Sequence, residues 1–355
     1  AAAMELVNAE ISATGKGSNG IQNKGSLTLT NVNVKDSKNH GIYNGSKLIA
    51  EAVTVSGTGD NGIYNDQGEA TFTNLTVTNA KGQGVNNNAT ITLNDVKISE
   101  TGKNGIQNSG TANVTKVTVI APKNHGVYNK GTLSGSELTV TDASGNGIYN
   151  DGGKVESFSK LTVSGVGEQG VNNTGSFVAA DVTISATGKN GIYNSAGTAK
   201  VEKLTVSGTG EHGVNNAAAM ELVNAEISAT GKGSNGIQNK GTLTLKSVTV
   251  KDSKNHGIYN GGKLTAEAVT VSGTGDNGIY NDQGDATVNV LTVSKTGGQG
   301  VNNSGTITLN DVKISDTGKN GIYNSAGTAK VEKLTVSATG EHGVNNAAAM
   351  ELVNA

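Results

Sequence analysis

The chain of 355 residues contains no cysteine, no tryptophan and no arginine, and its only proline is Pro122. The absence of cysteine rules out disulfide bonds and thiolate metal sites, and it is compatible with secretion. No apolar run approaches the length of a membrane span. No basic segment precedes an apolar one at the start, so we expect a signal peptide to be absent or already removed.

Excess charge is also lacking. The 27 lysines nearly balance the 29 acidic residues, which leaves a net charge of −2. A nucleic-acid-binding domain normally has a basic patch, and this composition offers none. We therefore expect neither a nucleic-acid partner nor a membrane span in this segment.

Glycine is abundant, with 52 residues, and much of it belongs to a repeat. The tetrad Gly-[Ile/Val]-x-Asn occurs sixteen times at intervals of 21 to 23 residues, first at Gly20–Asn23 and last at Gly343–Asn346. Such a period indicates one supersecondary unit stacked on itself. We therefore expect a single continuous solenoid over residues 1–355 rather than two ordinary domains.

Each repeat has the pattern of short strands. After the first tetrad, Leu27 and Leu29 alternate with polar residues, a two-residue polar break resets the alternation, and Val32 and Val34 alternate again. The next tetrad adds a third strand with Ile42 buried. Alternation of this kind buries one face of a strand. The pattern predicts an all-β fold, a right-handed parallel β-helix of about 16 coils, roughly 75 Å long at about 4.8 Å per coil.

The tetrad asparagine lies two residues after the buried Ile or Val, so it should point inward at a bend. Its amide group both donates and accepts hydrogen bonds. Stacked coils therefore predict an internal side-chain amide ladder. The expected ladder consists of Asn23, Asn44, Asn65, Asn87, Asn108, Asn129, Asn150, Asn173, Asn194, Asn216, Asn239, Asn260, Asn281, Asn303, Asn324 and Asn346.

The sequence also contains a longer repeat, which spans several coils. Residues 217–242 differ from residues 1–26 only in Thr242 for Ser26, and residues 347–355 are identical to residues 1–9, so the array restarts at Ala347. Neither end has a polar capping coil, and open strand edges invite pairing. We expect either a fragment of a longer array or a subunit that stacks end to end. The coil around Val155 and Phe158 carries extra residues, and its register stays open.

The chain contains patterns that resemble ligand sites, but each has a simpler interpretation. Six segments match Gly-x-Gly-x-x-Gly, yet a strand follows each, whereas a dinucleotide site requires a helix. Bends such as the one at Asp60 leave weak calcium binding open, although they lack the dense oxygen ligands of dedicated calcium loops. We predict no catalytic, cofactor-binding or metal residues and no cofactor.

The five histidines all precede a tetrad glycine, where Asn and Gln stand in other coils. The closest pair is two coils apart, about 10 Å, which is too far for a shared metal ion. We expect a polar corner column with hydrogen bonds along the stack. The histidines are His40, His125, His212, His256 and His342.

All eight tyrosines fall at the outward position of the tetrad, so neighbouring coils should bring their rings together. Cross-strand aromatic pairing is the simpler interpretation. The functional alternative is a contact strip for a glycan or a neighbouring solenoid, because aromatic residues anchor interfaces. The candidate strip consists of Tyr43, Tyr64, Tyr128, Tyr149, Tyr193, Tyr259, Tyr280 and Tyr323.

A column of threonines should also stand on the outer face. Regular threonine ranks are typical of ice-binding solenoids, but Lys97, Glu226 and Lys313 interrupt this one. Threonine also favours strands in general, and we prefer that interpretation.

The repeated Asn-Gly-Ile-Tyr-Asn, with its Leu-Thr-Val-Ser strand, resembles the right-handed parallel β-helix repeats of bacterial surface proteins, of the autotransporter-passenger and large-adhesin type. The resemblance covers the whole chain and implies an extracellular location at a bacterial cell surface. The same fold includes polysaccharide lyases and hydrolases, whose clefts combine acid clusters with Arg or Lys. This chain has no arginine and no coil with a unique acidic cluster, so site chemistry argues against an enzyme.

Near-identical coils favour a non-enzymatic structural or adhesive rod or filament segment, because a scaffold needs regularity while an active site needs an exception. The expected partners are copies of the chain, end to end or lateral, or glycans on host or neighbouring cells. Two alternatives stay open: a glycan-binding module that uses the tyrosine strip, and a polysaccharide-cleaving β-helix enzyme.

Overall fold

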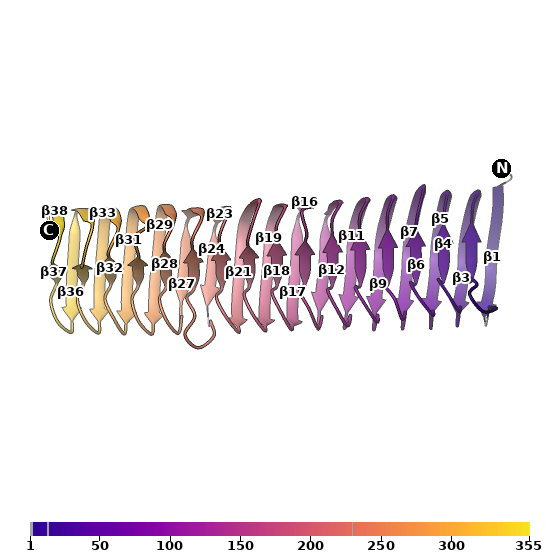
Figure 1. Cartoon of the computed structure of the whole chain (residues 1–355), viewed down its shortest axis with the longest axis horizontal. Helices are drawn as coiled ribbons and strands as arrows, with labels where there is room; N and C mark the ends of the chain where they lie inside the picture. The colour runs from indigo at the N-terminus through magenta and orange to yellow at the C-terminus, as the bar shows by residue number, and fades with distance from the viewer. Residues whose placement is uncertain (1–2, 13, 229) are drawn as a thin grey trace. The chain divides into compact units, whose positions relative to one another are not determined.

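A computed structural model describes residues 3–12, 14–228 and 230–355. Residues 1, 2, 13 and 229, which the near-identical segments 1–26 and 217–242 include, lie outside the described residues. The described residues form strands and no helix, and they divide into two compact units, Ala1–Ala180 and Asp181–Ala355. Each unit is a stack of parallel coils (Figure 1), so the predicted β-solenoid class is confirmed.

Each tetrad forms a three-residue strand that pairs in parallel and in register with the tetrad strand of the adjacent coil of its unit. In the first unit these strands are β2 (Ile21–Asn23), β4 (Ile42–Asn44), β6 (Ile63–Asn65), β8 (Val85–Asn87), β10 (Ile106–Asn108), β12 (Val127–Asn129), β15 (Ile148–Asn150) and β18 (Val171–Asn173). In the second unit they are β20 (Ile192–Asn194), β22 (Val214–Asn216), β25 (Ile237–Asn239), β28 (Ile258–Asn260), β30 (Ile279–Asn281), β32 (Val301–Asn303), β34 (Ile322–Asn324) and β37 (Val344–Asn346).

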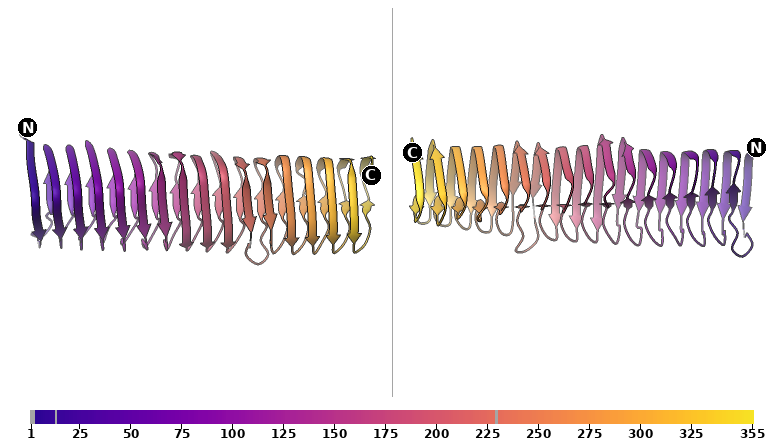
Figure 2. Two further views of the ribbon diagram at one scale, coloured as in Figure 1. Left: turned by 180° about the vertical axis from the view of Figure 1, so that it is seen from behind. Right: turned by 45° about the horizontal axis from the view of Figure 1, so that its top comes forward.

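The two strands predicted between successive tetrads form a second sheet in each unit, and their arrows lie side by side in Figure 2. In the first unit they are β1 (Ala3–Ser12), β3 (Ser26–Lys35), β5 (Lys47–Ser56), β7 (Glu69–Thr78), β9 (Thr90–Ser99), β11 (Thr111–Ile120), β13 (Thr132–Gly135), β14 (Glu137–Thr141), β16 (Lys154–Phe158) and β17 (Lys160–Val166). In the second unit they are β21 (Thr198–Thr209), β23 (Ala219–Val223), β24 (Ala225–Ser228), β26 (Thr242–Lys246), β27 (Val248–Lys251), β29 (Lys263–Thr274), β31 (Asp285–Thr296), β33 (Thr306–Thr317), β35 (Thr328–Glu332), β36 (Leu334–Thr339) and β38 (Ala349–Val353). Strand β19 (Ser176–Thr187) contains the boundary between the units.

At the polar break the alternation of buried and outward residues shifts by one residue. In several coils the two predicted strands run together as one long strand, and the residue after the phase change has left-handed backbone: φ is 54° at Asn31 and at Asn74, and 53° at Asp95. Asn and Asp tolerate this conformation better than other non-glycine residues. The left-handed residue lets the second half of the strand point its apolar side chains inward again.

The coil that the sequence left open contains an irregularity at the same place. Pairing of β16 with β19 shifts between Val155 and Phe158, and Ser157 between them has φ of 59°. The extra residue is absorbed as a β-bulge. Both Val155 and Phe158 remain fully buried, so the coil keeps its two inward positions.

The interior of a coil is the aliphatic set that the alternation predicts. Leu29, Val34 and Ile42 have no exposed surface, and Leu27 and Val32 are at most 6% exposed. Burying one such side chain contributes about 1.5–3 kcal/mol, but each coil exposes its edges until neighbours cover them. Stability therefore comes from stacking rather than from a single coil.

The tetrad glycine is required by close packing at the bend. A Cβ atom on Gly41 would overlap the side chain of Val55 and lie 2.7 Å from the carbonyl oxygen of Gly62 in the next coil. The same overlap recurs at Gly62 with Val77 and Gly84. Only glycine lets successive coils approach this closely here.

The tetrad asparagines form the predicted ladder in each unit. Every Nδ2 donates to the Oδ1 of the asparagine in the following coil over 2.7–2.9 Å, from Asn23 to Asn173 in the first unit and from Asn194 to Asn346 in the second. Asn44 and Asn65 are completely buried. The ladder thus satisfies polar groups that would otherwise be costly inside the solenoid.

We expect replacement of Asn65 by Ala to lower the free energy of unfolding by about 3 kcal/mol, because it removes two ladder bonds and leaves buried partners unsatisfied. Asn65 accepts from Asn44 Nδ2 at 2.8 Å and donates to Asn87 Oδ1 at 2.8 Å. Urea unfolding followed by circular dichroism measures the loss, and hydrogen exchange locates it. The control is Asn86→Ala at the neighbouring outward position, which should change stability by less than about 1 kcal/mol. Equal losses in the two variants would refute the role of the ladder.

Candidate functional site

The tyrosines lie on the outward side of the short strands, and the strand register pairs six of them. Tyr43 lies opposite Tyr64, Tyr128 opposite Tyr149, and Tyr259 opposite Tyr280. Tyr193 and Tyr323 instead lie opposite asparagines. The tyrosines therefore lie on the outward side that their tetrad position predicts, while their use as a contact strip stays a prediction.

The paired rings do not form a flat platform. Their centroids are 5.4–5.6 Å apart and their planes are inclined by 59–80°: two pairs meet edge to face, and the rings of Tyr128 and Tyr149 are tilted. Each paired tyrosine is only partly exposed. Edge-to-face contact is a favourable arrangement between aromatic rings, and it leaves less ring face available to a ligand than a coplanar row would.

A carboxylate that sequence reasoning missed binds the first tyrosine pair. Tyr43 donates its hydroxyl to Asp66 Oδ2 at 2.8 Å, and Tyr64 donates to Asp66 Oδ1 at 3.0 Å. The hydrogen bond from Tyr43 lowers the pKa of Asp66, and the carboxylate in turn raises the pKa of Tyr43. The detectable signal was an aspartate two residues after the second tyrosine of a pair.

A hydrogen bond from the first tyrosine of a pair to an aspartate recurs in the two other pairs. Tyr128 donates to Asp151 at 2.6 Å, and Tyr259 donates to Asp282 at 2.7 Å. The bond to Asp282, reinforced by burial, raises the pKa of Tyr259 to about 12. These tyrosines therefore stay protonated at physiological pH and act as hydrogen-bond donors.

A histidine packs against each tyrosine pair. The ring of His40 is 4.9 Å from that of Tyr64, His125 is 5.4 Å from Tyr149, and His256 is 5.1 Å from Tyr280. We call each group of a histidine, two tyrosines and an aspartate a His-Tyr-Tyr-Asp cluster. The three clusters are His40, Tyr43, Tyr64 and Asp66; His125, Tyr128, Tyr149 and Asp151; and His256, Tyr259, Tyr280 and Asp282.

The histidines also belong to the corner column, which forms a second hydrogen-bond chain. Asn61 Oδ1 accepts the backbone N–H of Gln83 at 2.9 Å in the next coil. Histidine Nδ1 takes the same role: His125 accepts from Asn146 N–H at 3.0 Å, and His212 accepts from Asn235 N–H at 2.9 Å. An acceptor at Nδ1 requires a neutral ring. His and Asn are thus interchangeable here because both present an acceptor atom to the following coil.

The bends offer few metal ligands. Asp60 Oδ2 lies 3.6 Å from His40 Nδ1, and Asp276 Oδ2 lies 3.6 Å from His256 Nδ1. Within the described ranges no three His, Asp or Glu side chains are grouped to hold a metal ion. Weak calcium binding and the absence of a cofactor stay predictions. The Gly-x-Gly-x-x-Gly segments lead into three-residue strands, as at Gly57–Gly62 before β6, so they lack the helix of a dinucleotide site.

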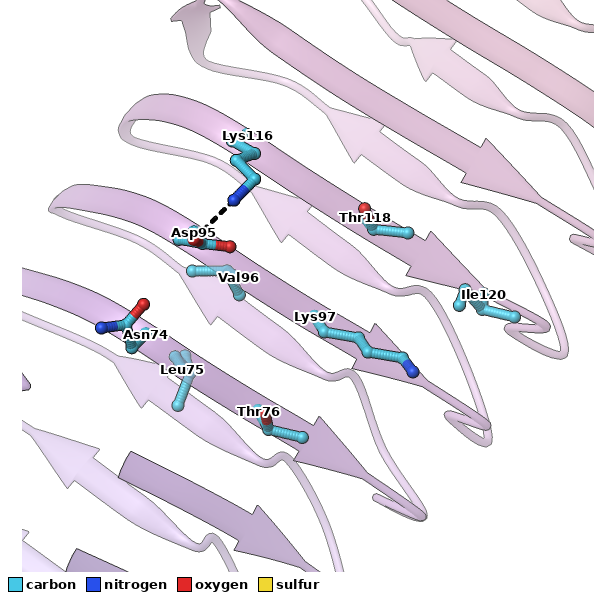
Figure 3. A pocket seen from close by; sticks show the side chains of 9 residues that line it. All are labelled: Asn74, Leu75, Thr76, Asp95, Val96, Lys97, Lys116, Thr118 and Ile120. Atoms are coloured by element: carbon cyan, nitrogen blue, oxygen red, sulfur yellow. Dashed lines mark hydrogen bonds and ion pairs between the residues drawn. The ribbon is translucent and has the colours of Figure 1, made fainter. Parts of the chain in front are cut away.

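A surface hollow of about 460 Å³ lies on the long strands β7, β9 and β11 (Figure 3). Its acidic residue, Asp95, is bound by Lys116 at 2.7 Å. Lys97 lies between Thr76 and Thr118 of the threonine column. A pair of free carboxylates, which glycoside hydrolysis normally requires, is not present among the residues that line this hollow.

No helix among the described residues has the length and apolarity that are needed to cross a membrane.

No protein-family model and no curated protein matches this sequence. Among solved structures, the chain is similar to the Siphovirus 9NA tailspike receptor-binding domain, with 13% identity and a TM-score of 0.35 over 98% of this chain and 72% of that chain. It is also similar to a mutant of the periplasmic alginate epimerase AlgG, with 10% identity and a TM-score of 0.30 over 93% of this chain and 76% of that chain. Both likenesses are too distant to bear on the site, and the parallel β-helix rests on the strand pairing itself.

We expect stability to fall as the pH drops below about 6.5, the usual pKa of histidine. Burial lowers the pKa of four histidines, and facing carboxylates oppose the shift only in part, so the folded chain binds fewer protons than the unfolded chain in this range. Stability is therefore complete above pH 6.5 and is lost as the pH falls toward the folded-state pKa values. The histidines and facing charges are His40 with Asp60, His125 with Glu168, His212 with Glu211 and Lys240, and His256 with Asp276.

Urea midpoints at pH 7.5 and pH 5.5 measure this loss. The matched control replaces all four histidines by Asn, the residue that other coils carry at the same corner. This variant should keep the corner hydrogen bonds and lose most of the pH dependence. An unchanged pH dependence in the variant would assign it to other groups.

Proposed function

We propose that this chain is a non-enzymatic, extracellular β-solenoid segment of a bacterial cell-surface protein, with a structural or adhesive role. The observation that carries the proposal is that the His-Tyr-Tyr-Asp cluster occurs three times. In each cluster the side chains that could act in catalysis, histidine, tyrosine and aspartate, make contacts between coils instead. An active site depends on one exceptional constellation, and this arrangement is a repeated one.

The contacts of the first cluster illustrate the argument. Both oxygens of Asp66 accept tyrosine hydroxyls, and Tyr64 also accepts from Asn88 at 3.0 Å. A general acid or base must reach a substrate proton, whereas this carboxylate is already bound by two donors from its own chain. Together with the bond from Asn88 to Tyr64, its hydrogen bonds join three successive coils, as expected of a structural group.

The outer faces support the same proposal. Outward lysines of the long strands bind carboxylates of adjacent strands, as in Lys160 with Glu137 at 3.4 Å and Lys246 with Glu221 at 3.0 Å. Exposed ion pairs of this kind contribute little to stability, but they give a surface of mixed charge that stays soluble. Such a surface suits an extracellular scaffold.

We expect no product when the purified chain is incubated with uronate-containing and neutral polysaccharides, with calcium present. Ultraviolet absorbance detects unsaturated sugars from a lyase, a reducing-end assay detects hydrolysis, and proton NMR detects epimerisation. A known β-helix lyase serves as the positive control. Turnover that rises in proportion to the concentration of this chain would overturn the proposal in favour of a polysaccharide-cleaving or polysaccharide-modifying enzyme.

Glycan binding through the tyrosine strip is the second candidate. The observation in its favour is that three ring pairs occupy the outward tetrad position in the same strand register, two in the first unit and one in the second. Three equivalent sites would bind a polymer with avidity, since linked sites raise each other's effective concentration.

On a glycan array, replacing all six paired tyrosines by Ala should abolish binding, and replacing one pair, Tyr43 and Tyr64, should weaken it. Because Tyr193 and Tyr323 are unpaired, their double Ala variant is the matched control and should bind as the parent does. Binding that survives the sixfold replacement would exclude the strip.

A further inference from the structure

Nine residues of identical sequence occur three times in this chain, at 1–9, 217–225 and 347–355. The copy at 217–225 lies inside the second unit, where its strand β23 pairs with β21 on one side and with β26 on the other. In this doubly covered copy Met220 is 4% exposed and Leu222 is completely buried. This copy therefore shows which coils fit against the two sides of the segment.

Each of the other two copies is paired on one side in the described part of the chain. Strand β1 pairs with β3, in the register that β23 has with β26, and β38 pairs with β35, in the register that β23 has with β21. Met4 is 60% exposed and Leu352 is 41% exposed. An opening of about 410 Å³ beside β1 is lined by Met4, Leu6 and Ile21 together with other residues of the first coils.

The coils that flank the internal copy recur beside the other two copies. Residues 319–346 repeat residues 189–216 with one difference, Ala338 for Gly208, and residues 1–26 repeat residues 217–242 with one difference, Ser26 for Thr242. The surface that covers β23 in the second unit is therefore present again at 319–346. The coil that it covers is present again at 1–26.

We propose that a second copy of this chain covers the opening beside β1, with residues 3–12 and 14–23 of one copy stacked on residues 328–346 of the other. The register is that of the internal copy, in which Thr198 pairs with Ala219 and Val201 with Leu222. The corresponding pairs at the joint are Thr328 with Ala3, Ala329 with Met4, Lys330 with Glu5, and Val331 with Leu6.

The internal copy also specifies the polar contacts of the joint. There Asn216 Nδ2 donates to Asn239 Oδ1 at 2.9 Å, and Asn235 N–H donates to His212 Nδ1 at 2.9 Å. The corresponding contacts join Asn346 to Asn23 and Asn19 to His342. The amide ladder and the corner chain would thus continue from one copy into the next, and the apolar opening would close.

Two segments of identical sequence compete for one place in the joint. Residues 349–353 of the first copy already occupy the place on β35 that residues 3–7 of the second copy would take. Exchange of one segment for the other conserves the contacts of that coil, because the two sequences are identical. The gain comes from the ladder bond, the corner bond and the covered apolar side chains, so association depends on displacing residues 347–355.

The test uses the full chain, which lacks cysteine, in the double variant Glu5→Cys and Lys330→Cys with a short bis-maleimide cross-linker. The side chains of both residues are exposed to solvent, and equivalent residues of adjacent parallel strands lie about 4.8 Å apart. We expect covalent dimers and higher multimers on a denaturing gel, with a yield that rises with protein concentration. The control pair, Glu5→Cys with Thr265→Cys, places the second cysteine three coils before Lys330 in the same column. It should give only the background yield of cross-linked dimer. Equal yields from the two pairs would overturn the proposal.

Two aspartate substitutions in the Glu5→Cys, Lys330→Cys chain should act in opposite directions. Leu6→Asp should lower the yield about tenfold or more, since it places an unpaired charge in the joint. Leu352→Asp loosens the competing segment and should raise the yield. General misfolding would change the cross-linking yield of both variants in the same direction. A change in the same direction for both, or no change in either yield, would therefore refute the joint.

Discussion

The hydrogen bond between tetrad asparagines of successive coils is the interaction on which the rest of the structure depends. A buried amide without partners is costly, and here each amide between the first and last rungs of a unit has one asparagine before it and one after it. Such a bond forms only when every coil brings its asparagine to the same place, as Asn44 and Asn65 do at 2.8 Å. The ladder therefore fixes the register of the short strands. The close approach at the tetrad glycine and the placement of the outward column follow from that register.

The outward side of the same strands explains how a structural repeat acquires what looks like a functional site. Once register is fixed, any side chain in the x position of the tetrad meets the corresponding side chain of the next coil. Tyr43 and Tyr64 make contact for this reason, and the aspartate after Asn65 is brought within reach of both hydroxyls. The His-Tyr-Tyr-Asp cluster is thus a consequence of stacking, and its recurrence in three places reflects the longer repeat in the sequence.

Periodicity was sufficient to predict the fold, because the pattern itself states which residues are equivalent. The inward positions Leu27, Leu29, Val32 and Val34, the polar break and the asparagine ladder could all be read from that equivalence. The bulge between Val155 and Phe158 could not, since an extra residue can be absorbed at several points of a coil. The contact between His40 and Tyr64 was also beyond the sequence, because it joins two columns and depends on side-chain rotamers rather than on spacing.

The ladder also has a direction. Each ladder asparagine donates from Nδ2 to a backbone carbonyl, as Asn87 does to Ala89 at 3.0 Å. In several coils, that of Asn87 among them, Oδ1 also accepts a backbone N–H, which fixes the orientation of the amide. Every rung within a unit consequently donates toward the following coil. A stack of this kind presents donors at one face and acceptors at the other, which makes its two faces chemically different. Pairing two equal faces across a twofold axis would set donor against donor or acceptor against acceptor, so the ladder is compatible with translation along the stack and incompatible with twofold closure.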